Sequence, residues 1–185
     1  MPADQPPAIR HRYETLGVRG FYGAHGAQYR NPHEPALTRA LAAAVAAWRP
    51  DLRRVLDLAC GSGEAALALR SLGAGELIGA DPFTAEAWRA RTGLPCLAHD
   101  FAAVAAGALD GQRFTLAVCS FALHLCEPSR LPAVCWAMTR LCAEWWVATP
   151  HKRPQLDPRW GWACTDELLV ERVRIRRHLA APPAG

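Results

Sequence analysis

The sequence predicts an α/β fold: a doubly wound, mostly parallel sheet with helices on both faces. Two observations predict it. From about residue 53 onward, short runs typical of buried strands alternate with stretches of helical periodicity. The 185 residues, of which 51% are hydrophobic and 21% charged, suit one soluble domain with its own core. Strands separated by crossover helices pair in parallel, so both faces of the sheet are expected to be covered.

We expect residues 1–185 to form a single domain. Residues 1–33 contain several prolines, then four glycines at a spacing of three with aromatic residues between them. This composition is typical both of a flexible N-terminal arm and of a mobile lid over a site, and both interpretations stay open. The first clear helix is predicted over 35–48, where apolar residues share one face, and it ends before Pro50. Residues 180–185 are predicted to be a frayed tail.

The remaining elements follow in chain order. The predicted strands are 55–59, 77–80, 96–98, 114–120 and 145–149. The predicted helices follow residue 63 and lie near 84–91, 101–109 and 129–142. Residues 168–179 alternate apolar and charged side chains as one edge strand would. In such a sheet, ligands bind beyond the carboxyl ends of the strands, where the strand order reverses.

Composition excludes several classes of protein. No apolar run is long enough to cross a membrane, and the first 15 residues are polar where a signal peptide would be apolar, so we expect a cytoplasmic protein without membrane contact. The seven cysteines are odd in number and form no Cys-x-x-Cys pair, which favours neither a disulfide framework nor a zinc ribbon. No metal site is predicted. The net charge of +4 is compatible with an acidic substrate or a weak nucleic-acid contact.

The chemistry-bearing segment follows the first strand, where residues 57–64 read DLACGSGE and lead directly into a helical pattern. Gly61 and Gly63 let a ligand approach the backbone, and the free N–H groups of the next helix favour a negative or strongly polar group. The segment also fits the G-x-G-x-x-A form of a dinucleotide-binding loop. Asp57 argues against a diphosphate and for a ligand with an amino group and a sulfonium cation. The structural alternative is that Asp57 only braces the turn.

The stretch VLDLACGSGEAALAL resembles the first motif of class I S-adenosylmethionine-dependent methyltransferases, which have a Rossmann-like fold. Three later stretches, IGADP, AHDF and FTLAVCSFALHL, follow at that family's intervals and resemble its second, third and fourth strand ends. The resemblance covers about residues 53–150. It implies that S-adenosyl-L-methionine is the methyl donor and that S-adenosyl-L-homocysteine is the product.

The resemblance also implies which residues hold the cofactor. They are Asp57, Gly61, Gly63, Asp81, Asp100, Phe101 and Ser120. Asp81 would accept hydrogen bonds from both ribose hydroxyls, and Asp100 would accept one from the adenine amino group. Phe101 would lie beside the adenine ring. Each has a structural alternative, because an acid at a strand end often caps the next helix and a phenylalanine is often core.

The acceptor site is expected just beyond the fourth and fifth strands. In-line methyl transfer needs the acceptor held about 3 Å from the methyl carbon and a group that takes its proton. His124 and His151 follow those two strands, and histidine titrates near neutral pH, so we predict both as catalytic. For His124 a packed or capping histidine remains the alternative. The predicted substrate-binding residues are Tyr22, Tyr29, His33 and Arg153.

The acceptor class is inferred partly from missing motifs. No Asn/Asp-Pro-Pro-Tyr/Phe motif follows the fourth strand, and that strand ends in Cys119-Ser120 without the acid that would bind magnesium. The short remainder after the fifth strand predicts a sheet shortened at its C-terminal end to about six strands, with Trp160 and Trp162 over the acceptor pocket. We therefore predict a small-molecule or short-peptide acceptor and a monomer or homodimer. The alternatives are a non-catalytic cofactor-binding module, an RNA methyltransferase and a small nicotinamide-dependent enzyme.

Overall fold

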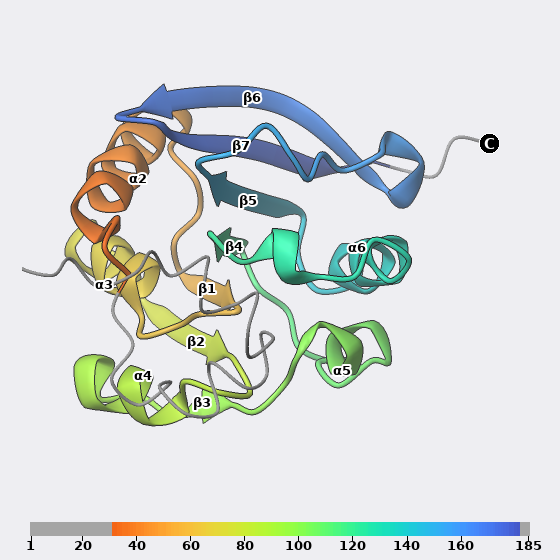
Figure 1. The fold of residues 1–185 in the computed structure, drawn as a ribbon, viewed down its shortest axis with the longest axis horizontal. Coiled ribbons are helices and arrows are strands. Elements are labelled where there is room, and N and C mark those ends of the chain that lie inside the picture. Colours follow the sequence, from red (N-terminus) through yellow and green to blue (C-terminus); the bar gives the residue numbers. More distant parts are fainter. Residues whose placement is uncertain (1–30, 182–185) are drawn as a thin grey trace, which may run out of the picture.

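A seven-stranded sheet runs through the centre of the molecule (Figure 1). The computed structural model describes residues 31–181. The strands are β1 (Arg54–Leu58), β2 (Glu76–Ala80), β3 (Cys96–Leu97), β4 (Leu116–Ser120), β5 (Glu144–Thr149), β6 (Trp162–Val170) and β7 (Val173–Ala180). Their order is β3-β2-β1-β4-β5-β7-β6. The first five strands pair in parallel, whereas β7 is antiparallel to both β5 and β6.

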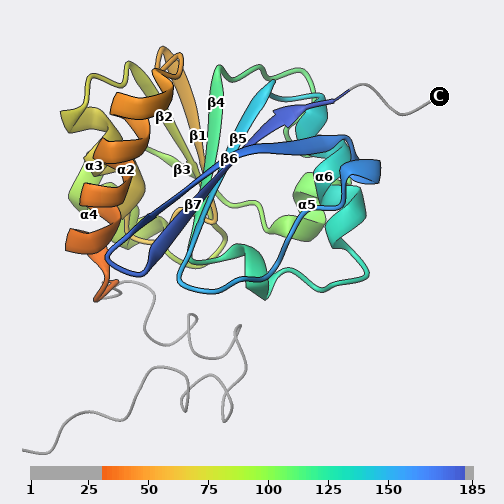
Figure 2. The ribbon, with the colours of Figure 1, turned by 90° about the horizontal axis from the view of Figure 1, so that it is seen from above.

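Helices cover both faces of the sheet. They are α2 (Glu34–Trp48), α3 (Glu64–Ser71), α4 (Ala85–Thr92), α5 (Phe101–Ala105) and α6 (Leu131–Thr139), with two 3₁₀ turns, η2 (Leu123–Leu125) and η3 (Pro158–Trp160). Figure 2 shows α2, α3 and α4 on one side of the sheet and α5 and α6 on the other. The predicted doubly wound α/β fold is therefore confirmed, as is the alternation of strands and helices from residue 53 onward.

Strand β5 shows how the two hydrophobic layers are built. Successive side chains of a strand point to opposite faces, so Trp145 and Trp146 enter different layers although both are fully buried. Trp146 packs edge-to-face on Trp48 of α2, with ring centroids 5.1 Å apart. Trp145 packs in the same manner on Trp162, at 5.5 Å. The Trp162 indole N–H donates to the carbonyl of Cys135 in α6 at 2.9 Å, so this tryptophan belongs to the core.

The C-terminal region differs from the prediction of one edge strand and about six strands in all. Residues 168–179 contain a two-residue turn at Glu171 and Arg172, both at positive φ, and the chain folds back as the β6–β7 hairpin. Hairpin turns of this kind are usually marked by Asn-Gly or Asp-Gly, so a Glu-Arg turn leaves the alternating pattern unbroken. Between β5 and β6, residues 150–161 contain the η3 turn and no other named helix or strand.

The two predicted terminal segments coincide only partly with the described residues. Most of the predicted arm, 1–33, lies outside them, as do residues 182–185 of the predicted tail. Ala180 instead belongs to β7, and the N–H of Ala181 donates to Gly161 O at 2.9 Å. Within residues 31–181, no helix has the length and apolar character that a membrane crossing requires.

Candidate functional site

A cavity of about 480 Å³ opens beyond the carboxyl ends of β1, β2, β3 and β4. Strand β1 lies between β2 and β4, and the chain order reverses there, so the loops that follow neighbouring strands diverge and leave a crevice. A volume of this size suits a small-molecule cofactor or substrate. The lining residues used below are Asn31, Ala59, Cys60, Gly61, Glu64, Asp81, Asp100, Phe101, Ser120 and Phe121.

The glycine loop after β1 forms one wall. Ala59 and Gly61 both have φ of 55°, and Gly61 lines the cavity. Gly63 has φ of 90° and precedes the first residue of α3. A Cβ on Gly63 would lie 2.7 Å from the Thr92 side chain and 3.2 Å from the ring of Trp88, so α4 packs directly on this glycine. Gly63 therefore shapes the loop from behind and is not among the cavity-lining residues.

Asp57 lies beneath the loop and not on the cavity wall. Its side chain is fully buried, and Oδ2 accepts from the N–H of Ala66 in α3 at 3.2 Å. Oδ1 has no hydrogen-bond partner among the described residues. Burial and the nearby carboxylate of Glu64 raise the pKa of Asp57 well above its usual range. The hydrogen bond from Ala66 therefore links Asp57 to the start of α3, and Asp57 stabilises the glycine loop from below, as the structural alternative predicted.

Asp81 joins the loop after β2 to the glycine loop. Its Oδ1 accepts from the N–H groups of Phe83 at 2.8 Å and Thr84 at 3.1 Å, and its Oδ2 accepts from Gly61 N–H at 3.3 Å. Burial raises the pKa of Asp81, while these N–H donors oppose the rise. The carboxylate also lines the cavity, so it can meet a ligand hydroxyl while it holds the two loops together.

The third wall comes from the start of α5. Asp100 is the N-cap of this helix, and its Oδ1 accepts from Ala103 N–H at 2.8 Å. Phe101 is half-buried and packs against the core of that face. Both residues also line the cavity. Asp100 as a helix cap and Phe101 as a core residue can therefore still contact a ligand there. An apolar ring beside a carboxylate suits an aromatic ligand that carries an amino group.

The far side of the cavity begins at the end of β4. Ser120 lines it, and so does Phe121, a non-glycine residue at φ of 54°. The ring of Phe121 lies 5.7 Å from the ring of His33, which precedes α2. His33 therefore approaches the cavity wall from the N-terminal side of the fold. Tyr22 and Tyr29 lie outside the described residues.

The two predicted catalytic histidines lie side by side. His124 belongs to η2 after β4, His151 follows β5, and their ring centroids are 6.2 Å apart at nearly a right angle. Partial burial, with a smaller contribution from His151, lowers the pKa of His124. Each histidine keeps a large part of its surface exposed to solvent, and neither lines the cavity, although the adjacent Leu125 does. Arg153 is exposed beyond β5 and is likewise not among the lining residues.

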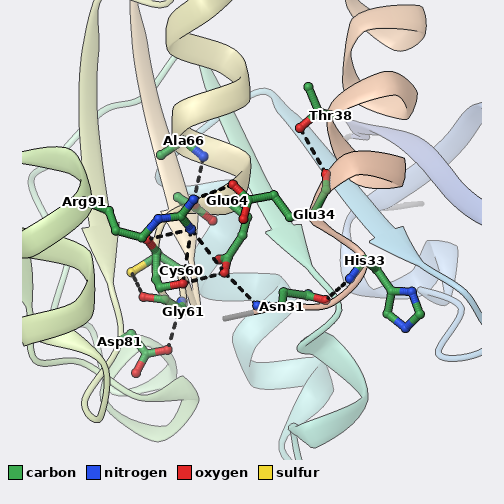
Figure 3. A network of polar contacts seen from close by, with 12 residues as sticks. Asn31, His33, Glu34, Thr38, Cys60, Gly61, Glu64, Ala66, Asp81 and Arg91 are labelled. Carbon is green, nitrogen blue, oxygen red and sulfur yellow. Dashed lines mark hydrogen bonds and ion pairs between the residues drawn. The ribbon is translucent and has the colours of Figure 1, made fainter. Parts of the chain in front are cut away.

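Glu64, which was not among the residues predicted from the sequence, is the centre of a polar network beside the cavity (Figure 3). Glu64 is only 4% exposed, and its Oε1 accepts from Asn31 N–H at 3.0 Å and from the Ser62 hydroxyl. Arg91 of α4 lies 3.4 Å from the same oxygen and also pairs with Glu34 of α2. An acid at the first position of a helix is a recognisable signal, but nothing in the sequence points from Arg91 to its partners.

Two further findings concern the tryptophans after β5 and the metal-ligating residue types. Trp162 is a fully buried core residue and Trp160 packs against the same cluster, so the expectation that they cover an acceptor pocket is wrong. No group of three or more His, Cys, Asp or Glu that could hold a metal ion occurs within residues 31–181.

Two comparisons by sequence find similar proteins. Residues 55–144 match the family described as "Methyltransferase domain". An uncharacterized protein of Schizosaccharomyces pombe is 36% identical over an alignment of 227 positions, which covers 92% of this chain and 91% of that protein.

Solved structures show the same fold at lower sequence identity. Magnesium protoporphyrin IX methyltransferase from Synechocystis PCC 6803, solved with bound S-adenosylmethionine, has a TM-score of 0.60 and 16% identity, with 98% of this chain and 100% of that chain covered. A 1,6-didemethyltoxoflavin-N1-methyltransferase from Burkholderia thailandensis, solved with its named substrate and S-adenosylhomocysteine, has a TM-score of 0.66 and 19% identity, with 98% and 94% covered.

Proposed function

Because the chain belongs to the class I S-adenosylmethionine-dependent methyltransferases, we propose that it transfers a methyl group to a small-molecule or short-peptide acceptor. The observation that carries the proposal is the cavity at the reversal of strand order, where the glycine loop, Asp81 and Asp100 converge. Carboxylates suit the hydroxyl and amino groups of a nucleoside and the positive charge of a sulfonium. The same carboxylates are poorly suited to the diphosphate of a nicotinamide cofactor, because like charges repel.

The cofactor would be held by residues from three strand ends. Gly61 allows close approach of the methionine portion, and the adjacent carboxylate of Glu64 can accept from its ammonium group. Asp81 would accept hydrogen bonds from the ribose hydroxyls. Asp100 would bind the adenine amino group, and Phe101 would pack against the adenine ring. Asp57 and Gly63 would act indirectly by fixing the loop, and Ser120 would lie on the methyl side. S-adenosylmethionine supplies a methyl group activated by the sulfonium.

His124 and His151 would serve the acceptor. A lowered pKa keeps the imidazole of His124 neutral near pH 7, which is the form that takes a proton from a hydroxyl, amine or imidazole. His33, beside Phe121, would contact the acceptor from the other side, and Arg153 would meet an anionic part of it. Tyr22 and Tyr29 remain predicted substrate contacts.

The arginines near the C-terminus bear on the RNA alternative. Arg174 and Arg176 both pair with Glu167, and Arg177 pairs with Glu144. An arginine that is already neutralised within the fold contributes little to phosphate binding. These ion pairs support a small acceptor over RNA.

The test uses calorimetry and a labelled methyl group. We expect S-adenosylmethionine and S-adenosylhomocysteine to bind and NAD not to bind. Protein incubated with methyl-labelled cofactor and separate pools of metabolites, short peptides and total RNA should label the metabolite or peptide pool. Label in RNA alone would favour the RNA alternative. Binding without label in any pool, unaffected by replacing both His124 and His151 with Ala, would favour the non-catalytic module.

A further inference from the structure

Two thiols lie in contact beside the cavity, and one of them, Cys60, lines it. The Sγ atoms of Cys60 and Cys96 are 3.6 Å apart, although 36 positions separate the two residues in the sequence. Cys60 belongs to the glycine loop, lines the cavity and is 3% exposed. Cys96 is the first residue of β3 and is half-buried, so it is the one that solvent can reach. All seven cysteines are free thiols in the structure.

The two thiols differ in reactivity. A hydrogen bond from the Cys60 thiol lowers the pKa of Cys96, and the positive charge of Arg89 adds to this effect. Burial raises the pKa of Cys60 well above its usual range. Since the thiolate is the nucleophile, Cys96 is the sulfur that an oxidant meets first and Cys60 is placed to resolve the product. Burial raises the pKa of the other five cysteines, so none of them is activated in this way.

We propose that Cys60 and Cys96 are a redox modification site, oxidised by peroxide to a reversible disulfide that weakens cofactor binding. The Cys96 thiolate attacks one oxygen of hydrogen peroxide, so that an S–O bond forms, the O–O bond breaks and the released hydroxide takes a proton to become water. Cys60 then attacks the Cys96 sulfenic sulfur, the S–S bond forms, and the hydroxyl leaves as water with the Cys60 proton. Two thiols and one peroxide thus give one disulfide and two waters.

The disulfide would distort the cavity wall. The sulfurs must close from 3.6 Å to about 2.05 Å, so the glycine loop and β3 must approach each other. Gly79 lies directly under Cys60, where even an added Cβ would be 2.9 Å from its Sγ, so the loop has little room to move in that direction. Gly61 donates to Asp81, and the Cys96 Sγ lies 3.6 Å from the carbonyl of Asp81. The shift therefore reaches the residues proposed to bind the ribose.

The chemical part of the proposal is tested without cofactor. The full-length protein is treated with hydrogen peroxide, blocked with an alkylating agent and digested with trypsin, which leaves Cys60 in peptide 55–70 and Cys96 in peptide 92–113. We expect these two peptides to be cross-linked, two thiols to be lost and dithiothreitol to restore them. Cys60→Ser and Cys96→Ser should abolish the cross-link, whereas Cys164→Ser should retain it.

Two results would overturn this part: oxidation of Cys96 to a sulfinic acid without the cross-link, or a peroxide-treated protein with all its thiols intact. If Cys60→Ser does not fold, as judged by the absence of a cooperative melting transition, Cys60→Ala replaces it, because an alanine side chain suits a buried position. A cross-link that survives in that variant would also overturn the assignment.

The effect on binding rests on the proposed function and has its own readout. Calorimetric titration with S-adenosylmethionine should show about a tenfold or greater loss of affinity after oxidation, reversed by dithiothreitol and absent in Cys96→Ser. Equal affinities of oxidised and reduced protein would overturn the effect on binding. If neither form binds the cofactor, the proposed function fails together with this effect, while the cross-link is still decided by mass spectrometry.

Discussion

A single carboxylate, that of Asp81, has both a structural and a proposed functional role. It accepts hydrogen bonds from three backbone N–H groups in two loops, and it also lines the cavity. The amide of asparagine keeps one acceptor oxygen, which can serve the N–H groups of Phe83 and Thr84, but it puts an NH2 group where Oδ2 accepts from Gly61. Asp81→Asn therefore removes the charge together with one loop contact, and its stability is measured beside its ligand affinity.

Asp81→Asn should weaken S-adenosylmethionine binding by about 1.5–3 kcal/mol, because hydrogen bonds from the ribose to a charged acceptor would be lost. Isothermal titration calorimetry measures the effect. Asp110→Asn is the matched control, since Asp110 is an exposed acid that pairs with Arg140 and is not among the cavity-lining residues. Unchanged affinity in Asp81→Asn would remove Asp81 from the proposed cofactor site.

The pH dependence of turnover tests His124 as the base. Its pKa is lowered, so kcat should fall on acidification with a midpoint below the ordinary histidine value of about 6.5. His124→Ala should abolish this acidic limb and lower kcat by roughly 10²–10⁴-fold. Since His151 contributes to the lowered pKa, His151→Ala should move the midpoint to higher pH. A pH profile identical in wild type and His124→Ala would show that another group takes the proton.

The cavity-lining residues near the ends of strands could be predicted from the sequence. Asp81, Asp100 and Ser120 stand at or just after the carboxyl ends of parallel strands, which gather at one edge of any such sheet. Glu64 and Arg91 could not be predicted in the same way. Their contact joins helices α3 and α4 and depends on how those helices pack, which no local pattern encodes.

At the scale of elements, the five parallel strands and the helices between them lie close to their predicted positions, because periodicity and the flanking glycines and prolines mark them. The β6–β7 hairpin was predicted as one strand. Its turn residues carry no local signal, and the pairing with β5 is a long-range contact. The predicted fold class therefore did not depend on the part of the chain where the prediction of elements failed.

Gly79 shows how tightly β2 packs under α4. A Cβ at this position would lie 2.7 Å from two atoms of the Trp88 ring, so Gly79→Ala should destabilise the protein by about 1–3 kcal/mol through overpacking. Urea unfolding measures this change. Adding Trp88→Phe should make the alanine substitution less costly, because the smaller ring leaves room. Additive effects of the two substitutions would show that Trp88 is not the obstacle.

His178 makes the stability of β7 depend on pH. Burial lowers its pKa to about 4, and its Nδ1 lies 3.3 Å from Trp145 O. As the pH falls below about 6.5, the unfolded chain binds a proton that the folded chain does not, so stability is lost down to about pH 4, by about 3 kcal/mol in all. His178→Gln should lose less stability over this range in urea unfolding at pH 7 and pH 4.5. If wild type and His178→Gln lose the same free energy of unfolding between pH 7 and pH 4.5, another group is responsible for the acid sensitivity.

At the scale of the whole molecule, the cavity depends on loops from several strands, so a bound cofactor should stabilise the entire fold. S-adenosylmethionine at 100 times its dissociation constant should add about 2.7 kcal/mol to the free energy of unfolding, and NAD should add nothing. Thermal unfolding followed by circular dichroism, with and without each ligand, measures the difference. A melting temperature raised by NAD and not by S-adenosylmethionine would contradict the cofactor assignment.

The antiparallel direction of β7 has a practical consequence. Its last residue, Ala180, donates to the carbonyl of Ala143, which directly precedes β5, so β7 ends at the amino ends of the parallel strands, opposite the cavity. An affinity handle, fluorophore or surface linker attached beyond this strand therefore starts from the end of the sheet that lies opposite the cavity. Immobilised protein prepared in this orientation is suited to screening candidate acceptors.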